Sequence, residues 1–344
     1  RSPRLEDLRA IAVVLPYIED DAISKTLVDR IEAQLGTKLF LGTNAESVRL
    51  QMLLERVKYK YLRDETELSL LELFMKIEDV VDPSVRAACF SWMLYSLQQL
   101  PNPSEFEKKA SLVSQATASL MTAIDSLLIS SADHYQAAKS AIYALARADT
   151  KLAFNLISRF NTEERRDRGY VTFIREIVTS KIYVTQPGVL IKAVNCIEDE
   201  KTRSIEIVKL MHAIAIHCER KEVIDVNLGV IGLWRNIRIA NVKFQAIAAA
   251  YKIFAICYSN RDKAEELLLE MKGIWSSIMV DWVRTDVGYY FVGDIAKIDK
   301  PLAVIWLDHI STEEKNRVSM SRDFTLVLNQ ILNLLVRCYG SLAS

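Results

Sequence analysis

The sequence predicts an all-α fold, a right-handed α-solenoid of antiparallel helix pairs. Three observations support it. One twenty-residue element occurs twice, and apolar positions recur at intervals of 36 to 40 residues. Only 10 glycines and 7 prolines occur among 344 residues, which leaves little room for turn-rich β structure. A period of this length is typical of solenoids, in which each helix pair buries its apolar face against its neighbours.

The repeated element covers residues 145–164 (LARADTKLAFNLISRFNTEE) and residues 295–314 (IAKIDKPLAVIWLDHISTEE). Asp149 and Asp299 each stand between two apolar-periodic stretches, where a carboxylate accepts N–H groups of the next helix's first turn. Thr162 and Thr312 are predicted to cap a third helix, whose positive end suits the two glutamates that follow each threonine. The predicted unit is therefore helix, Asp cap, helix, Thr cap, helix.

Weaker copies of the second turn are visible elsewhere in the chain. Residues 80–86 (VVDPSVR) and 197–203 (IEDEKTR) repeat the pattern of residues 160–166, with Asp82 predicted as a further cap. Five apolar residues are predicted to anchor successive turns, at intervals of 37, 40, 37 and 36 residues. They are Phe160, Ile197, Ile237, Ile274 and Ile310.

The order of elements predicts two regions. The first is an N-terminal helical region, residues 1–103, which is expected to supply capping or linking repeats. The second is a regular helical-repeat array, residues 104–344. The boundary is placed at residues 101–105 (PNPSE), where two prolines precede a capping serine. Helices are predicted over residues 5–36 (as a pair), 44–63, 67–80, 84–100 and 106–129, and regular pairs from 131 to about 337.

Composition restricts the class of protein. The 44 basic and 44 acidic residues balance, which argues against a bulk polyanion-binding protein. Five cysteines lie in apolar helical stretches and indicate reduced core residues, and no apolar run is long enough to span a bilayer. We therefore expect a cytoplasmic protein without a membrane segment. Because the chain opens with Arg1 rather than Met, we also expect it to be a portion of something longer.

No catalytic or metal-binding signature is present, so we expect neither enzymatic activity nor a cofactor. His212 and His217 stand five residues apart, one too many for a metal pair on a single helix face, and there is no C-x-x-C. The glutamate pairs after Thr162 and Thr312 are better explained by the helix dipole than by acid–base catalysis. Nucleophile-elbow, zinc-protease, phosphate-loop and dinucleotide-glycine motifs are all absent.

Aromatic residues and arginines concentrate in two stretches, around residues 234–238 and 275–290. Because aromatics with arginine are typical anchors of protein interfaces, we predict a partner-binding set there. Its members are Trp234, Arg235, Arg238, Trp275, Trp282, Tyr289 and Tyr290. The alternative interpretation is that large residues at helical spacing fill the core between helices.

Two further hypotheses belong to other functional classes. A HEAT-like nucleic-acid binder would use a set of basic residues partly interleaved with aromatics, and its affinity would fall steeply with salt. That set is Lys58, Lys60, Arg63, Arg235, Arg238 and Lys243. A purely structural scaffold or oligomerisation segment would instead self-associate. For the basic residues near position 60, the alternative is an ordinary helix C-terminus with cations near its negative end.

The A-x-x-D-x-x-L-A element, with its T-E-E and I-E-D-E-x-x-R turns, resembles the degenerate tetratricopeptide- and HEAT-like arrays of bacterial proteins. It looks most like the C-terminal sensor solenoids of STAND-type NTPases, including those of antiviral defence. The resemblance covers roughly residues 130–320, and the Trp, Gly-Tyr and Pro positions of the standard tetratricopeptide repeat are not matched. It implies a recognition arm whose concave face binds a foreign or partner protein and thereby permits oligomerisation through domains outside this chain.

Overall fold

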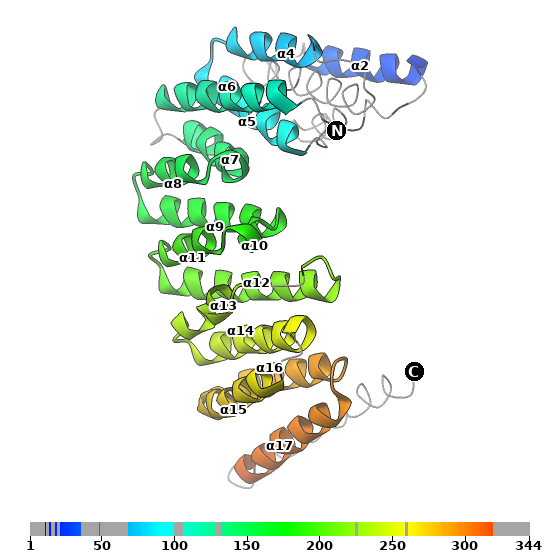
Figure 1. The fold of residues 1–344 in the computed structure, drawn as a ribbon, viewed down its shortest axis with the longest axis vertical. Coiled ribbons are helices and arrows are strands. Elements are labelled where there is room, and N and C mark those ends of the chain that lie inside the picture. Colours follow the sequence, from blue (N-terminus) through cyan, green and yellow to red (C-terminus); the bar gives the residue numbers. More distant parts are fainter. Residues whose placement is uncertain are drawn as a thin grey trace. The chain divides into compact units, whose positions relative to one another are not determined.

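All regular secondary structure in the described residues is helical, as a computed structural model of the chain shows (Figure 1). The structure describes residues 21–35, 68–99, 106–127, 132–223, 226–258 and 261–318, together with the single positions 11, 14, 18 and 48. The all-α prediction is confirmed for this part of the chain. The predicted helix over residues 44–63 and the break at residues 101–105 lie outside it, apart from position 48.

The chain divides into two compact units, Arg1–Ser180 and Lys181–Ser344. The helices of unit 1 are α2 (Asp21–Leu35), α4 (Leu68–Glu78), α5 (Pro83–Gln99), α6 (Phe106–Asp125), α7 (Ala132–Ala148), α8 (Thr150–Ser158) and α9 (Glu163–Thr179). The α-helices of unit 2 are α10 (Ile182–Thr185), α11 (Pro187–Asn195), α12 (Glu200–Glu219), α13 (Leu228–Ile231), α14 (Ala240–Ile253), α15 (Arg261–Ser277), α16 (Asp281–Ile295) and α17 (Lys300–Val318). Unit 2 also contains a 3-10 helix, η3 (Gly232–Asn236), and a π-helix, η4 (Phe254–Tyr258).

Within each unit, alternate helices pack on one another. In unit 1, α5 packs against α6 and α7, and α7 packs against α9. In unit 2, α12 packs against α14, and α14 packs against α15 and α16. The predicted boundary near residue 103 falls within unit 1, where α5 and α6 lie on either side of it and are in contact. Each unit therefore has a layer of every second helix with the remaining helices beside it (Figure 1).

Charged side chains bridge the helices of each layer. In unit 1, Arg147 at the end of α7 pairs with the buried Glu176 of α9, and its guanidinium lies 4.8 Å from the ring centre of Tyr95 on α5. In unit 2, Lys252 of α14 lies 2.5 Å from the carboxylate of Asp294 on α16. Pairing matters most for Glu176, whose side chain is 6% exposed, because an isolated buried charge is strongly destabilising. The same arrangement of alternate helices is thus held by an ion pair in both units.

Five turns of the chain share one geometry, which we call the anchor turn. Its first residue, the anchor, is a buried apolar residue whose N–H donates to the carbonyl three positions earlier, at 3.1 to 3.3 Å. The anchors are Val80, Phe160, Ile197, Ile237 and Ile278. The hydrogen bond closes the last turn of the preceding helix in the tightened 3-10 manner that is common at helix ends.

A cation stands six residues after every one of these anchors. The five are Arg86, Arg166, Arg203, Lys243 and Arg284. In three of the turns, Nη1 of the arginine donates to the anchor carbonyl: from Arg166 at 3.2 Å, from Arg203 at 3.1 Å and from Arg284 at 2.8 Å. The anchor carbonyl belongs to the end of one helix and the arginine to the first turns of the next. Each arginine therefore joins two consecutive helices and satisfies a carbonyl that has no partner within its own helix.

Within the described residues, all the predicted caps except Thr312 form where the sequence places them. Asp149 Oδ1 accepts from the N–H groups of Lys151 and Leu152 at 2.9 and 3.1 Å, and Asp299 Oδ1 accepts from Leu302 N–H at 3.0 Å. The remaining caps lie in anchor turns: Asp82 before α5, Thr162 before α9 and Asp199 before α12. Hydrogen bonds from the side chain and backbone of Thr202 hold the pKa of Asp199 below its ordinary value. These carboxylates serve the first turns of helices.

Two predicted anchors are wrong. Ile310 is buried, but α17 continues through it to Val318, so Thr312 lies inside a helix and does not cap a new one. Ile274 lies within α15, and the anchor of that turn is Ile278, four residues later. Neither of the two positions is followed six residues later by a cation, since these places hold Asn316 and Val280.

Replacing Arg203 with methionine tests the anchor turn. We expect Arg203→Met to lower the free energy of unfolding by about 1–3 kcal/mol, because it keeps the apolar stem but removes a charge-assisted hydrogen bond to the carbonyl of the fully buried Ile197. Urea denaturation followed by circular dichroism measures the change. Lys201→Met, at an exposed position in the first turn of the same helix, is the control and should shift stability by less than about 0.5 kcal/mol. Equal effects of the two changes would contradict the role given to the arginine.

Candidate functional site

Three of the predicted contact residues are core residues. Trp234, Trp275 and Tyr289 are all buried, and Trp275 is 0% exposed. The structure places these three side chains in the packing between helices, and of the three only Trp234 lines a pocket described below. The alternative interpretation, that large aromatics fill the space between helices, describes them.

The two tryptophans occupy equivalent places, each three residues before an anchor. The cation of each anchor turn lies over the indole: Lys243 Nζ is 5.3 Å from the ring centre of Trp234, and the guanidinium carbon of Arg284 is 5.6 Å from that of Trp275. Trp275 Nε1 also donates to the carbonyl of Arg284 at 2.9 Å. Cation–π contact and burial together explain why these positions hold tryptophan.

The other predicted residues have different surroundings. Arg235, Arg238 and Tyr290 are exposed. Trp282 belongs to α16, but its side chain lies outside the described residues. Three residues of the nucleic-acid hypothesis, Lys58, Lys60 and Arg63, also lie outside them. A fourth, Lys243, is turned towards Trp234 and lies 3.9 Å from Glu270, so it does not project freely from the surface.

A pocket of about 210 Å³ opens beside Trp234 in unit 2. Three short elements build it: α13, η3 and the start of η4. The residues that line it are Leu228, Ile231, Gly232, Trp234, Arg235 and Phe254. Apolar side chains form most of the wall, and Arg235 is the one charged residue among these six. The sequence prediction included two of them, Trp234 and Arg235, but not the pocket.

Arg235 is held at this pocket by packing on aromatic and backbone atoms. Its guanidinium carbon lies 4.6 Å from the ring centre of Trp234. Gly232 makes room for the guanidinium, because a Cβ at that glycine would stand 2.8 Å from Arg235 Nη1. No carboxylate within the described residues pairs with Arg235. Its N–H groups are therefore available to an acceptor outside the described chain.

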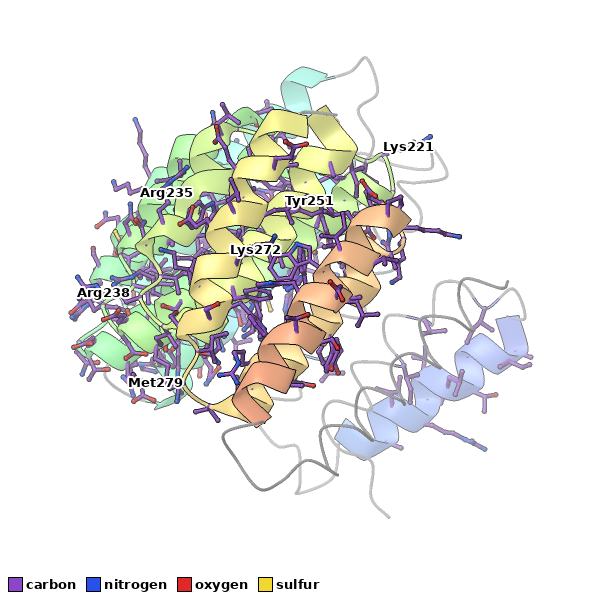
Figure 2. All side chains as sticks on the ribbon, turned by 90° about the horizontal axis from the view of Figure 1, so that it is seen from below. Lys221, Arg235, Arg238, Tyr251, Lys272 and Met279 are labelled. Atoms are coloured by element: carbon purple, nitrogen blue, oxygen red, sulfur yellow. The ribbon has the colours of Figure 1, made fainter. Side chains whose placement is uncertain are left out.

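Exposed apolar and cationic residues lie along the same side of unit 2. Arg238 and Met279 each directly follow an anchor, and together with Arg235 they lie on the side opposite Lys221 (Figure 2). Met279 is 94% exposed. The Arg238 side chain is 86% exposed, with Nε 3.8 Å from Glu200, a long distance for an ion pair. We call Arg235, Arg238 and Met279 the turn-edge surface.

The described residues contain no cluster of side chains suited to metal binding. No group of three or more His, Cys, Asp or Glu side chains in this part of the chain is arranged to hold a metal ion. Cys89 and Cys218 are buried free thiols, and Cys196 is a half-buried one. Among the helices described, none combines the length and apolar character needed to cross a bilayer.

Both histidines of α12 are partly withdrawn from solvent. Burial, reinforced by the charge of Lys252 and opposed by Asp294, lowers the pKa of His212 below its ordinary 6.5. Burial likewise lowers the pKa of His217; the charge of Glu222 opposes this shift, and the charges of Lys181 and Arg220 add to it. His217 Nδ1 lies 3.1 Å from the hydroxyl of Tyr183, which is fully buried. The two side chains are structural parts of the α12 packing.

Comparisons of the chain with protein-family models, with curated proteins and with solved structures find no match. The function must therefore be argued from the geometry of the molecule. Within the described residues, that geometry offers a small apolar pocket with an arginine on its wall and the turn-edge surface on the same side of unit 2.

The lowered histidine pKa values predict how stability depends on pH. Because the unfolded chain binds protons more readily than the folded chain, the free energy of unfolding should be fully retained above about pH 6.5 and should fall as pH drops below that value. Melting temperatures measured at pH 7.5 and pH 5.5 check this. A double variant, His212→Gln with His217→Gln, should lose part of the difference. An undiminished difference in that variant would show that other groups cause it.

Tyr289 and Tyr290 are neighbours in α16 and form a matched pair for testing burial. Tyr289 is 7% exposed and Tyr290 is 73% exposed. We expect Tyr289→Ala to cost about 3–5 kcal/mol of unfolding free energy because it leaves a cavity in the core. We expect Tyr290→Ala to cost less than about 0.5 kcal/mol. Urea denaturation of both variants measures the two effects, and similar losses would contradict the orientation of α16.

Proposed function

We propose that this chain is an α-solenoid that binds another protein and performs no catalysis of its own. Two structural features support the solenoid. The anchor turn recurs along the chain, and within each unit every second helix packs on the next. In repeat proteins of this kind, each helix pair is stabilised by its neighbours, and the surface residues are left for recognition.

The turn-edge surface is the observation that best supports a role in protein binding. Met279 is a large apolar side chain that is almost completely exposed, and it lies on the same side of unit 2 as Arg235 and Arg238. Exposing such a side chain to water is unfavourable, while methionine and arginine are both enriched where proteins contact one another. A protein ligand that covers Met279 and reaches the arginines explains the combination.

The biological setting that we propose follows the resemblance to sensor solenoids. In that setting the chain is the recognition region of a larger STAND-type protein, and ligand binding controls assembly through domains outside this chain. A foreign protein produced during infection is then the natural ligand. The turn-edge surface supplies the contact in either case, whether the ligand is foreign or a cellular partner.

Nucleic acid fits this surface less well than protein does. Glu200 lies near Arg238 and Glu270 near Lys243, so carboxylates interrupt the basic groups. The face of Trp234 is covered by Arg235 and Lys243 and offers no platform for stacking a base. Affinity that falls steeply with salt is the property that would separate a nucleic-acid binder from a protein binder.

Affinity capture tests the proposal. Immobilised chain is incubated with lysates of uninfected and virus-infected host cells and washed at low and high salt. We expect a discrete protein to be retained by the wild type through the high-salt wash and to be reduced at least about tenfold with Met279→Glu, because a charge there opposes burial of the contact. Quantitative mass spectrometry of the eluates measures retention.

The chain provides a matched control for this experiment. Val81 also directly follows an anchor and is 91% exposed, but it lies in unit 1. Val81→Glu introduces the same charge at the equivalent place and should retain the ligand. Recovery of nucleic acid that elutes with salt, without a protein, would contradict the proposal. The same would hold if Met279→Glu captured every protein as well as the wild type does.

A further inference from the structure

We infer that the pocket beside Trp234 receives one apolar side chain of an acidic peptide segment, whose carboxylates pair with Arg235 and Arg238. This inference rests on the proposed protein-binding function and specifies the chemistry of the ligand. Its basis is the size of the pocket, the position of the single charged group on its wall and the lack of a close described carboxylate at Arg235 and Arg238.

The volume of the pocket selects a side chain over a small molecule. Sites for cofactors and drug-sized ligands occupy roughly 300–1,000 Å³. The pocket here measures about 210 Å³ and is therefore too small for them. An apolar cavity of about 150 Å³ is large enough to hold benzene. One phenylalanine or leucine side chain therefore fits the pocket, with its backbone remaining at the surface.

The pocket wall has the composition that such a side chain requires. Leu228, Ile231, Trp234 and Phe254 contribute apolar surface from three different elements. Phe254 is the first residue of the π-helix η4, and π-helical turns are found frequently at functional sites. Leu228 lines the pocket yet stays 62% exposed, so a bound side chain would cover apolar surface that the chain itself leaves in water.

Arg235 determines the charge of the ligand. One face of its guanidinium packs on Trp234, which leaves the N–H groups at the edge of the plane to act as donors. A carboxylate is the acceptor that matches this fork of donors, and no described carboxylate fills the place. The indole fixes the guanidinium in position before the ligand arrives, which reduces the entropy lost on binding.

Arg238, three residues after Arg235 in the sequence, supplies a second positive charge. Glu200 is its nearest described acid, at 3.8 Å, and the side chain remains largely in solvent. A ligand carboxylate that approaches more closely would replace this long contact with a direct hydrogen bond. The ligand is thus expected to carry acidic residues beside its apolar one.

Synthetic peptides test the inference directly. The probe is the fluorescein-labelled heptapeptide EDEFEDE, with EDEAEDE and KSKFKSK as controls for the apolar side chain and for the charge. Binding to the whole chain is measured by fluorescence polarisation. We expect EDEFEDE to bind, and both control peptides to bind at least about tenfold more weakly.

Two pocket variants and one matched control locate the binding. Arg235→Glu reverses the charge on the pocket wall. Gly232→Ala places a methyl group 2.8 Å from Arg235 Nη1, the mobile end of a long side chain, so it displaces the arginine without disturbing the backbone. Both should weaken EDEFEDE binding at least about tenfold. Gly188→Ala in α11 meets no atom within 4 Å and should bind as the wild type does. Circular dichroism confirms that each variant is folded.

Each contrary result overturns the inference. It fails if EDEFEDE does not bind at about 1 mM, the weak end of measurable affinity. It also fails if KSKFKSK binds equally well, or if Arg235→Glu and Gly232→Ala leave the affinity unchanged. The lysate experiment separates these failures from failure of the proposed function. A protein ligand that is lost with Met279→Glu but retained by Arg235→Glu would preserve the function and remove the pocket from it.

Discussion

The hydrogen bond from an arginine to the carbonyl of a buried residue six positions earlier joins consecutive helices in three of the five anchor turns. The last carbonyls of a helix have no partner within that helix, and burying them unsatisfied is costly. In three turns an arginine donates a hydrogen bond to such a carbonyl at the end of the preceding helix: Arg166, Arg203 and Arg284. Arg284 does so while 0% exposed, so its own charge is also taken out of water. In these three turns, consecutive helices are therefore joined by a specific side chain.

Much of the fold could be predicted from the sequence because caps and anchors are local features. Asp149, Asp299 and Thr162 were recognisable from their position before an apolar stripe, and their hydrogen bonds confirm them. Ile274 and Ile310 were misplaced for a physical reason. Every helix of an array has buried apolar residues, so apolar character alone does not separate a residue at a turn from one inside a helix. All five anchors are followed six residues later by a cation, but so are buried residues inside helices, such as Leu145 and Ile214, so this spacing alone does not identify a turn.

The candidate site was harder to predict because burial is a property of packing. Trp234 and Trp275 have the composition of an interface anchor, but their place three residues before an anchor puts them inside the helix layers. Met279 is not among the predicted contact residues, although it directly follows an anchor and is exposed. The sequence did not predict the pocket. It forms from α13, η3 and η4, three elements of four or five residues that give no periodic signal.

The anchor turn separates the residues that hold the fold from those that face solvent, and this has an evolutionary consequence. In each of the five turns the residue directly after the anchor is exposed, and these positions differ widely in chemistry. They hold Val81, Asn161, Glu198, Arg238 and Met279. Exposed substitutions of this kind change stability by only about 0.5 kcal/mol or less, so these positions can diversify without loss of folding. Under the proposed function, ligand specificity can thus vary one turn at a time.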